Sequence, residues 1–262
     1  MNNNNKIYIV LFLLLLAGVA KVADTLSFFY FNPDSAQSNL SQLKTDMDAS
    51  LSGSQQAISF QAFSRHENLL EQVKAGKPSL LYVPFWYIQR YGKELGIKPL
   101  LYSSRLDKTT YQKKLITNIS SNKSIAELEN STMAMTTMGP DSRTILDSII
   151  FSKHKLDSNK LSIIEVPKDA DAIFAVALGQ VDSALVSESN LTHLKQRNPR
   201  LTAAVRVIGS TNSISLPILC YVEGTLNEKE LESLRAFVLK NGKTNNKKIT
   251  DILNIDAWSP GA

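Results

Sequence analysis

Five short segments of this chain bring together side chains that could bind a small polar molecule. Each segment follows a predicted β-strand, and in open α/β sheets ligands bind beyond the carboxyl ends of the strands. In the first half of the chain the segments are Asn32 to Ser35, Ser64 to His66 and Pro84 to Tyr87. In the second half they are Met138 to Arg143 and Ser187 to Ser189.

The residue types in these segments suit recognition by hydrogen bonding, stacking and charge. Trp86 and Tyr87 can form an aromatic wall, and Ser35 and Ser142 can donate hydrogen bonds. The arginines can pair with an anion, whereas the glutamate would suit an amine or a hydroxyl group. The candidate ligand-binding residues are Asn32, Ser35, Arg65, Trp86, Tyr87, Ser142, Arg143, Ser187 and Glu188.

Each candidate also has a structural interpretation. Ser35 and Ser142 stand where helices are predicted to begin and could act only as N-caps. Trp86 and Tyr87 could pack in the core beneath the cleft, and the charged candidates could face solvent. Asp182, at the entrance of a buried strand, is expected to cap backbone groups.

The sequence contains no recognisable catalytic motif. His66, His154 and His193 lack the spacing of a metal site, and there is no Gly-x-Ser-x-Gly segment. Cys220, the only cysteine, lies in the apolar run Ile218 to Val222 and is predicted to be a buried thiol. We therefore expect a binding protein with no cofactor and no metal, with an enzyme of the same fold as the alternative.

Helices that alternate with short apolar strands must position these side chains. Leu69 to Val83 (LLEQVKAGKPSLLYV) and Ile173 to Ser187 (IFAVALGQVDSALVS) each combine an amphipathic helix, a glycine and a buried strand. Gly76 and Gly179 are expected to end their helices in a left-handed conformation, and a strand buried on both faces is typical of a βαβ layer. One fold unit is therefore predicted to occur twice.

The same alternation extends along the whole chain. Strands are predicted over residues 25–31, 57–63, 79–83, 98–103, 111–118, 132–137, 161–166, 183–186, 205–208 and 217–222. Helices are predicted over residues 35–51, 65–74, 84–95, 125–128, 142–151, 170–178 and 228–239. This pattern predicts an α/β fold of two lobes, each a mostly parallel sheet flanked by helices.

The chain is expected to cross twice between the lobes. Residues 24–110 and 206–262 are predicted to form lobe 1, and residues 111–205 are predicted to form lobe 2. A cleft would lie between the lobes, and the two crossing strands would bend as a hinge when it closes on a ligand.

Residues 1–23 are predicted to be a signal peptide. Lys6 precedes the unbroken apolar run Ile7 to Leu16, which is shorter than the roughly 20 residues that span a bilayer, and small residues follow. An uncleaved anchor is the alternative. No cysteine is present there to carry a lipid, so a free periplasmic or secreted protein is expected.

The net charge argues against a nucleic-acid partner. Loss of Lys6 and Lys21 with the signal peptide lowers the formal charge from +5 to +3. The remaining lysines are scattered apart from the tail Lys240 to Lys248, which is typical of a solvated face. A small-molecule ligand is therefore the expected partner of a protein that we predict to be monomeric.

Several motifs in this order resemble the type II periplasmic substrate-binding proteins, and among them the PhnD-like receptors of phosphonate ABC transporters. Val83-Pro84-Phe85-Trp86-Tyr87 is similar to their Gly-Pro-x-Pro-Tyr turn. Gly179 to Ala184 is similar to Gly-x-Val-Asp-x-Ala. The likeness also covers Phe31-Asn32-Pro33, Tyr111 to Leu128, and Ile252 to Pro260.

The resemblance implies a function as well as a fold. In that family a Gly-Ser-Thr-Ser loop at a helix N-terminus holds the phosphonate oxygens, whereas this chain has Gly139-Pro140-Asp141-Ser142-Arg143. The resemblance implies a periplasmic protein that captures a phosphonate-like or phosphate-like solute and docks on a membrane permease. The alternative is a sensory or orphan receptor of the same fold that signals to a membrane partner.

Overall fold

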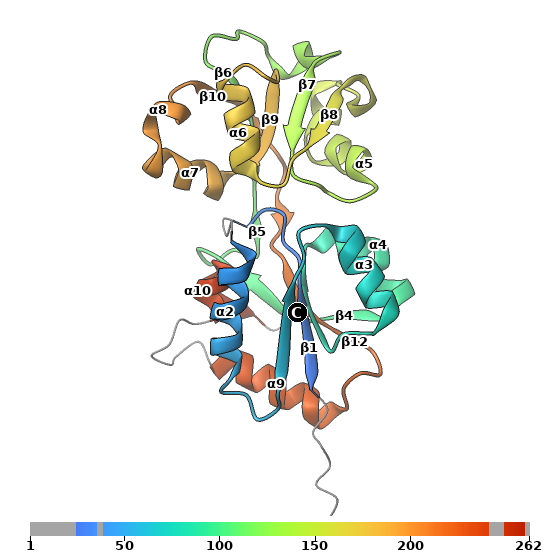
Figure 1. Cartoon of the computed structure of the whole chain (residues 1–262). Coiled ribbons are helices and arrows are strands. Elements are labelled where there is room, and N and C mark those ends of the chain that lie inside the picture. Colours follow the sequence, from blue (N-terminus) through green and yellow to red (C-terminus); the bar gives the residue numbers. More distant parts are fainter. Residues whose placement is uncertain (1–24, 36–38, 241–248, 260–262) are drawn as a thin grey trace, which may run out of the picture.

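The computed structural model describes residues 25–35, 39–240 and 249–259, and these form two lobes joined by a narrow connection (Figure 1). The predicted signal peptide, residues 1–23, lies outside the described residues. No helix in the described ranges is long and apolar enough to cross a membrane.

Lobe 1, the lower lobe in Figure 1, is built on a sheet with the strand order β13-β4-β12-β3-β1-β2. Its strands are β1 (Leu26–Tyr30), β2 (Ile58–Ala62), β3 (Leu80–Val83), β4 (Ile97–Ser104), β12 (Ile218–Val222) and β13 (Ala257–Ser259). Its helices are α2 (Leu40–Leu51), α3 (His66–Ala75), α4 (Phe85–Leu95), α9 (Glu228–Lys240) and α10 (Ile249–Leu253).

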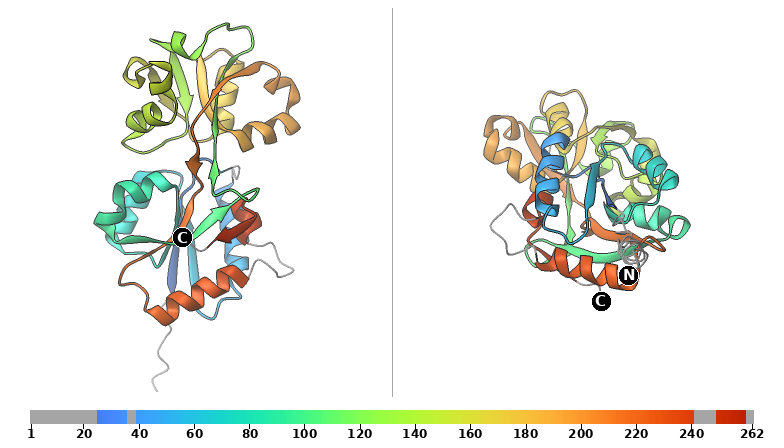
Figure 2. Two further views of the ribbon diagram at one scale, coloured as in Figure 1. Left: turned by 180° about the vertical axis from the view of Figure 1, so that it is seen from behind. Right: turned by 60° about the horizontal axis from the view of Figure 1, so that its bottom comes forward.

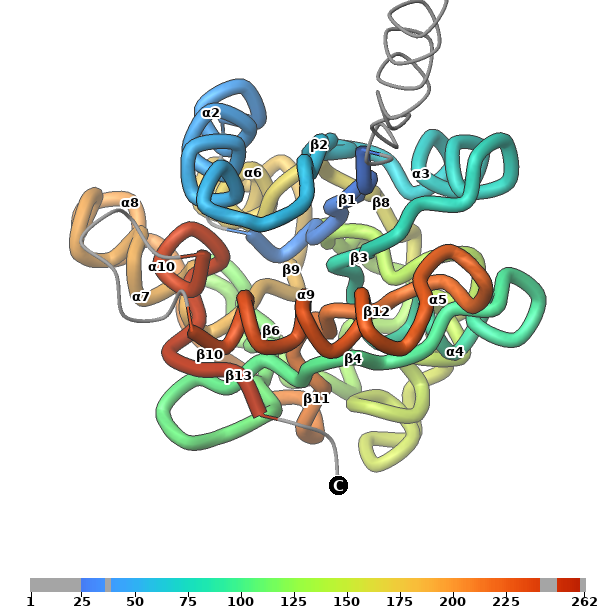
Figure 3. The backbone as a smooth tube through the Cα atoms, turned by 90° about the horizontal axis from the view of Figure 1, so that it is seen from below, coloured from blue at the N-terminus to red at the C-terminus, as the bar shows by residue number. Residues whose placement is uncertain are grey.

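Alternating side chains of the lobe 1 strands supply two apolar cores. Phe28 and Tyr30 of β1 pack on one face with α2, α9 and α10, whereas Phe29 and Phe31 belong to the opposite face with α3 and α4. The view from below shows α2 and α10 on one side of the lobe and α3 and α4 on the other (Figure 3). Both faces of the central strands are therefore covered.

Lobe 2 has a sheet with the order β10-β6-β9-β7-β8. Its strands are β6 (Lys113–Asn118), β7 (Thr132–Met135), β8 (Ser162–Glu165), β9 (Ser183–Ser187) and β10 (Val205–Ser210). Its helices are α5 (Ser142–Leu146), α6 (Asp169–Ala177), α7 (Glu188–Arg197) and α8 (Pro199–Thr202), with the short turns η1 (Ile125–Leu128), η2 (Asp147–Phe151), η3 (Ser152–His154) and η4 (Ser158–Lys160). Leu115 and Ile116 point to opposite cores, one beside α5 and the other beside α6.

The predicted repeat of one fold unit is confirmed. In both lobes a first strand lies between a second and a third strand parallel to it, which gives β1-α2-β2-α3-β3 and β7-α5-β8-α6-β9. An antiparallel strand, β12 or β6, then pairs with the third strand. Gly179 has the expected left-handed φ of 70°, but Gly76 is extended with φ of −155°, so the predicted left-handed cap is wrong there.

Most strands in each sheet run in the same direction, as predicted, but both sheets also contain antiparallel pairs. Strands β12, β13 and β6 are reversed, because the chain enters β12 and β6 from the strands that connect the lobes and β13 from the C-terminal helix α10. β10 is antiparallel to β6, the only described strand with which it pairs. The helix predicted over residues 142–151 is also two pieces, since α5 continues into the π-helical turn η2. In the described residues α2 begins at Leu40, capped by the Asn39 side chain, and not at Ser35.

Two short strands connect the lobes. β5 (Thr110–Tyr111) and β11 (Ile214–Ser215) form an antiparallel pair between the two sheets, visible from behind in Figure 2. β10 pairs with β6 within the lobe 2 sheet, so the strand predicted to return to lobe 1 first completes lobe 2. The lobe boundaries at 110/111 and 205/206 remain predictions.

Candidate functional site

The loops that follow the repeated strands meet between the two lobes. The turn after β1 contributes Asp34, and the segment after β7 contributes Thr136, at equivalent places in the two units. Their side chains are in direct contact, with 2.6 Å between Thr136 Oγ1 and Asp34 Oδ1. The cleft predicted from the strand order is thus closed at this point by polar contacts.

Asp34 is held by its own turn and by lobe 2. Its amide donates to the Asn32 side-chain oxygen over 3.1 Å, as expected for an Asn-Pro-Asp turn. Its carbonyl accepts a bond of 3.0 Å from Asn190 Nδ2 on α7. The carboxylate is therefore fixed in direction across the cleft.

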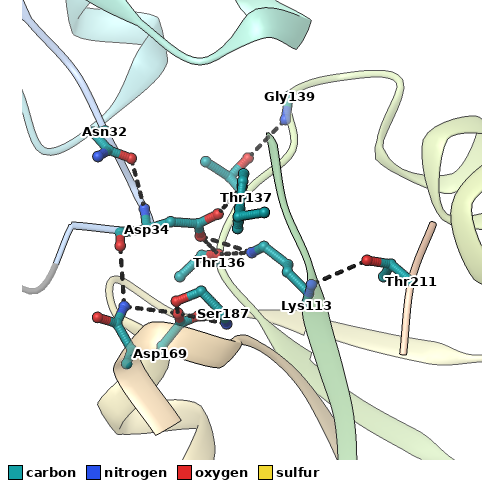
Figure 4. A network of polar contacts seen from close by, with 11 residues as sticks. Asn32, Asp34, Lys113, Thr136, Thr137, Gly139, Asp169, Ser187 and Thr211 are labelled. Atoms are coloured by element: carbon teal, nitrogen blue, oxygen red, sulfur yellow. Dashed lines mark hydrogen bonds and ion pairs between the residues drawn. The ribbon is translucent and has the colours of Figure 1, made fainter. Parts of the chain in front are cut away.

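Lys113, the first residue of β6, lies opposite Asp34 and is only 1% exposed. Its Nζ lies 2.7 Å from Asp34 Oδ1 and 2.8 Å from Thr136 Oγ1 (Figure 4). Its amide donates to the Thr211 hydroxyl over 3.0 Å, which ties β6 to the second crossing segment. Because a buried ammonium needs a partner of opposite charge, the Asp34 carboxylate is what compensates Lys113 in this position.

Three donors converge on the Asp34 carboxylate. Lys113 and Thr136 donate to Oδ1, and the Tyr111 hydroxyl donates to Oδ2 over 2.5 Å. Burial raises the pKa of Asp34, but the Lys113 charge and the three hydrogen bonds outweigh it, so the pKa lies below its usual value. The arrangement is chemically a receptor for an oxyanion.

Asp169, at the start of α6, is a second buried carboxylate close to Lys113. Its Oδ2 accepts from the amide and hydroxyl of Ser187 at 2.9 and 2.5 Å and from Asn190 Nδ2 at 2.8 Å. Its Oδ1 is buried and has no hydrogen-bond partner in the described ranges. Burial raises the pKa of Asp169 and the Asp34 charge adds to this, although Lys113 acts in the opposite direction.

Trp86 closes the cleft on its other side. Its ring packs edge-on against Phe31 and His66, with centroids 6.1 and 5.6 Å apart. It also lies against Gly139 of lobe 2, where an added Cβ would be 2.4 Å from Trp86 Cζ3. A glycine is required here because only a bare backbone leaves room for the indole ring.

Two cavities lie beside the Asp34 turn, and each receives residues from both lobes. A cavity of about 200 Å³ is lined by Asn32, Ser35 and Ser64 of lobe 1 and by Lys168 of lobe 2. A more open cavity of about 480 Å³ is lined by Ser35, Asp169, Asn190, His193, Arg197 and Asp251, among others. The smaller cavity has the dimensions of a small solute, and its wall includes Pro33 and Ser35, the two chain neighbours of Asp34.

Three of the predicted residues lie at this closed cleft, and a fourth, Tyr87, lies in the core of lobe 1. Asn32 and Ser35 line the smaller cavity, and Trp86 contacts lobe 2. Tyr87 is fully buried against Tyr91, and its hydroxyl has no partner among the described residues. Tyr87 therefore packs in the core, as its structural interpretation required.

The other predicted residues have protein partners. Arg65 is exposed and pairs with Glu67, and the Ser187 hydroxyl donates to Asp169. The Ser142 hydroxyl donates a hydrogen bond to the Gly139 carbonyl. Ser142 is the first residue of α5, and Asp141 holds the N-cap position without a side-chain hydrogen bond, so the N-cap interpretation of Ser142 is wrong. Two charged side chains are also engaged: Arg143 donates to the Ser158 and Leu161 carbonyls, and Glu188, which begins α7, pairs with Lys114 at 3.1 Å.

The central residues Asp34, Tyr111, Lys113, Thr136, Asp169 and Asn190 were not among the predicted site residues. Lys113 could have been found, because it shares its strand face with the buried residues Leu115 and Thr117, where a lysine is out of place. Asp34 lies within the predicted segment Asn32 to Ser35, but the sequence Asn32-Pro33-Asp34 indicates only a turn. The predicted capping role of Asp182 is confirmed, since its carboxylate accepts from the Thr132 amide at 2.9 Å.

Other chemistries find less support in the described part of the chain. There, no group of three or more His, Cys, Asp or Glu side chains could hold a metal ion. Cys220 is buried as predicted, and burial raises the pKa of its thiol well above the usual value.

Comparison with known proteins agrees with the geometry. The family profile described as "ABC transporter, phosphonate, periplasmic substrate-binding protein" matches residues 28–262. No curated protein sequence matches the chain.

Solved structures show the same fold at low identity. A binding protein component of an ABC phosphonate transporter from Pseudomonas aeruginosa is 16% identical, with a TM-score of 0.74 over 90% of this chain and 81% of that chain. PhnD1 from Prochlorococcus marinus, in complex with methylphosphonate, is 12% identical, with a TM-score of 0.72 over 90% and 92%. A Xanthomonas citri protein bound to ATP is 11% identical, with a TM-score of 0.71 over 91% of each chain.

Proposed function

Because this chain belongs to the family of periplasmic substrate-binding proteins of phosphonate ABC transporters, we propose that it binds a solute with an oxyanion group between its two lobes. The proposed solute class is phosphonate or phosphate, as in the methylphosphonate complex of the Prochlorococcus marinus relative. The protein would capture the solute in the periplasm and deliver it to a permease.

The observation that carries the proposal is the convergence of Tyr111, Lys113 and Thr136 on one carboxylate. Two hydroxyl donors and one ammonium, all buried or partly buried, hold an oxyanion there. Lys113 and Thr136 belong to lobe 2, whereas the turn that faces them belongs to lobe 1. A solute held at this position would contact both lobes and would favour the closed form.

The rest of the solute would lie in the cavity of about 200 Å³. Asn32, Ser35 and Ser64 from lobe 1 and Lys168 from lobe 2 supply polar groups to its wall. Trp86 would exclude water from the other side of the cleft, where it contacts Gly139. Direct ligand contacts by Arg65, Tyr87, Ser142, Arg143, Ser187 and Glu188 remain predictions, and the proposal does not depend on them.

The family also supports the proposed biological setting. We infer that residues 1–23 direct export, that the exported chain works as a monomer, and that the closed form docks on the membrane permease of an ABC transporter. Absence of an enzymatic activity belongs to the same proposal, because the side chains of the cleft are arranged to bind an anion and the family is one of transport receptors.

Calorimetric titration of residues 24–262 with methylphosphonate and inorganic phosphate tests this function. We expect one binding site, whose affinity falls at least tenfold in Lys113→Met but is retained in Lys114→Met. Lys114 is the matched control because it is the neighbouring lysine, more exposed and paired with Glu188. If no anion binds, or if the two lysine variants behave alike, the proposed site is wrong.

A further inference from the structure

The oxyanion receptor between the lobes is already filled by the chain itself. Asp34 accepts bonds from all three donors, at 2.7 Å from Lys113, 2.6 Å from Thr136 and 2.5 Å from Tyr111. The carboxylate is 13% exposed and the ammonium 1%, so this ion pair is shielded from water. A solute anion that approached Lys113 in this state would find the Asp34 carboxylate at the position that the anion itself would have to occupy.

The charges around the receptor strengthen this conclusion. Asp34 neutralises Lys113, and Asp169 adds a second carboxylate to the same buried region. At Lys113 itself no uncompensated positive charge is therefore left for a solute, and like charges at this range repel. A phosphonate or phosphate can reach the donors only after the Asp34 side chain has moved away from them.

We propose that Asp34 is a specificity-determining residue of this binding protein, because its carboxylate occupies the receptor that Tyr111, Lys113 and Thr136 form for a solute oxyanion. The inference rests on the proposed function, since it concerns the same receptor. Every oxyanion must displace Asp34 before it binds, and this displacement holds down the affinity for anions. An uncharged solute that lies only in the neighbouring cavity does not have to displace it.

The same contact links ligand selection to the position of the lobes. Asp34 is carried by the turn after β1 in lobe 1, whereas Lys113 and Thr136 belong to the lobe 2 sheet and to the segment after β7. Asn190 of lobe 2 also donates to the Asp34 carbonyl. Asp34 therefore holds the lobes together without a ligand, and a solute oxyanion that replaces the carboxylate takes over this role.

The test compares Asp34→Asn with Asp141→Asn in calorimetric titrations against methylphosphonate and inorganic phosphate. Asp141 is the matched control because it also pairs with a cation of the other lobe, Arg90 at 3.6 Å, but its side chain is 55% exposed and away from the receptor. Removal of one charge-assisted contact is expected to tighten anion binding by about ten- to a hundredfold in Asp34→Asn, with no change in Asp141→Asn. Asp34→Ser, whose side chain is too short to reach Lys113, is the second variant, and a melting curve verifies that each variant is folded.

The outcomes separate this inference from the proposed function. Tighter binding in Asp34→Asn or Asp34→Ser, with the control unchanged, supports it. If the parent protein binds the anions and both Asp34 variants bind equally or more weakly, the inference is wrong and the proposed function stands. If neither the parent nor any variant binds an oxyanion, the proposed function is wrong, and the inference fails with it.

Discussion

Gly139→Ala offers a direct way to separate closure of the lobes from their stability. Gly139 has φ of 81°, and a methyl group there would lie 2.4 Å from Cζ3 and 2.6 Å from Cε3 of Trp86. The first property strains the backbone in every state of the folded protein. The second matters only when lobe 1 and lobe 2 are in contact, because Trp86 belongs to the other lobe.

The two effects have different sizes and different readouts. A left-handed alanine costs about 1–2 kcal/mol, which should lower the melting temperature by roughly 2–8 °C for a domain of this length. Forcing a methyl group into a packed contact costs about 1–3 kcal/mol. Because this second cost arises only in the closed state, it should weaken solute binding by roughly 5- to 150-fold.

Gly179→Ala is the matched control. Gly179 also has a left-handed φ, of 70°, but nothing lies within 4 Å of the added methyl group. Small-angle scattering without ligand should therefore show a larger radius of gyration for Gly139→Ala than for Gly179→Ala, at similar melting temperatures. Trp86→Ala should restore closure in the Gly139→Ala background. Equal radii for the two glycine variants would refute the assignment of Trp86 and Gly139 to the closing contact.

Three further predictions concern single side chains. Tyr87→Phe should leave the free energy of unfolding unchanged or raise it, since the buried hydroxyl lacks a partner in the described residues. Tyr87→Ala should lower the free energy of unfolding by about 3–5 kcal/mol, because it removes a fully buried aromatic ring. Chemical denaturation measures both changes. Asp182→Asn should cost about 1 kcal/mol in the same assay because its charge-assisted bond to the Thr132 amide is weakened, and an unchanged midpoint would argue against the cap. The pKa of Asp34 is lowered in the closed state. The stabilisation of the closed state by Asp34 is therefore complete above its ordinary pKa of about 4 and is lost as the pH falls from there through the lowered pKa. Scattering should show an acid-induced opening that Asp34→Asn does not share.

The sequence predicted the repeated unit because its elements carry strong local signals. The strands β3 and β9 are buried along their whole length, and each contains an uninterrupted apolar run, residues 80–83 and 184–186. The helix α7 (Glu188–Arg197) gave only a weak signal, since none of its residues is fully buried and only the half-buried Leu191 and Leu194 pack against the core. The apolar pattern of the sequence could not predict the direction of each strand, because a strand between two others is equally apolar whether it runs parallel or antiparallel to them.

The site was harder to predict because its partners are far apart in the chain. Asp34 and Lys113 are separated by 79 residues, and Asp34 and Thr136 by 102. Taken separately, they have the sequence signals of a turn residue, a strand residue and a strand end. Only the topology, which places the turn after β1 opposite the segment after β7, brings them together. The predicted segment 32–35 contained the central carboxylate, but nothing local distinguished Asp34 from its neighbours.

A crystal structure of Asp34→Asn grown with methylphosphonate would test the central claim most directly. The account predicts the phosphonate group between the lobes, with its oxygens within hydrogen-bond distance of Lys113 Nζ, Thr136 Oγ1 and the Tyr111 hydroxyl. A phosphonate bound instead at Ser142 and Arg143, with Lys113 still paired inside the protein, would contradict it.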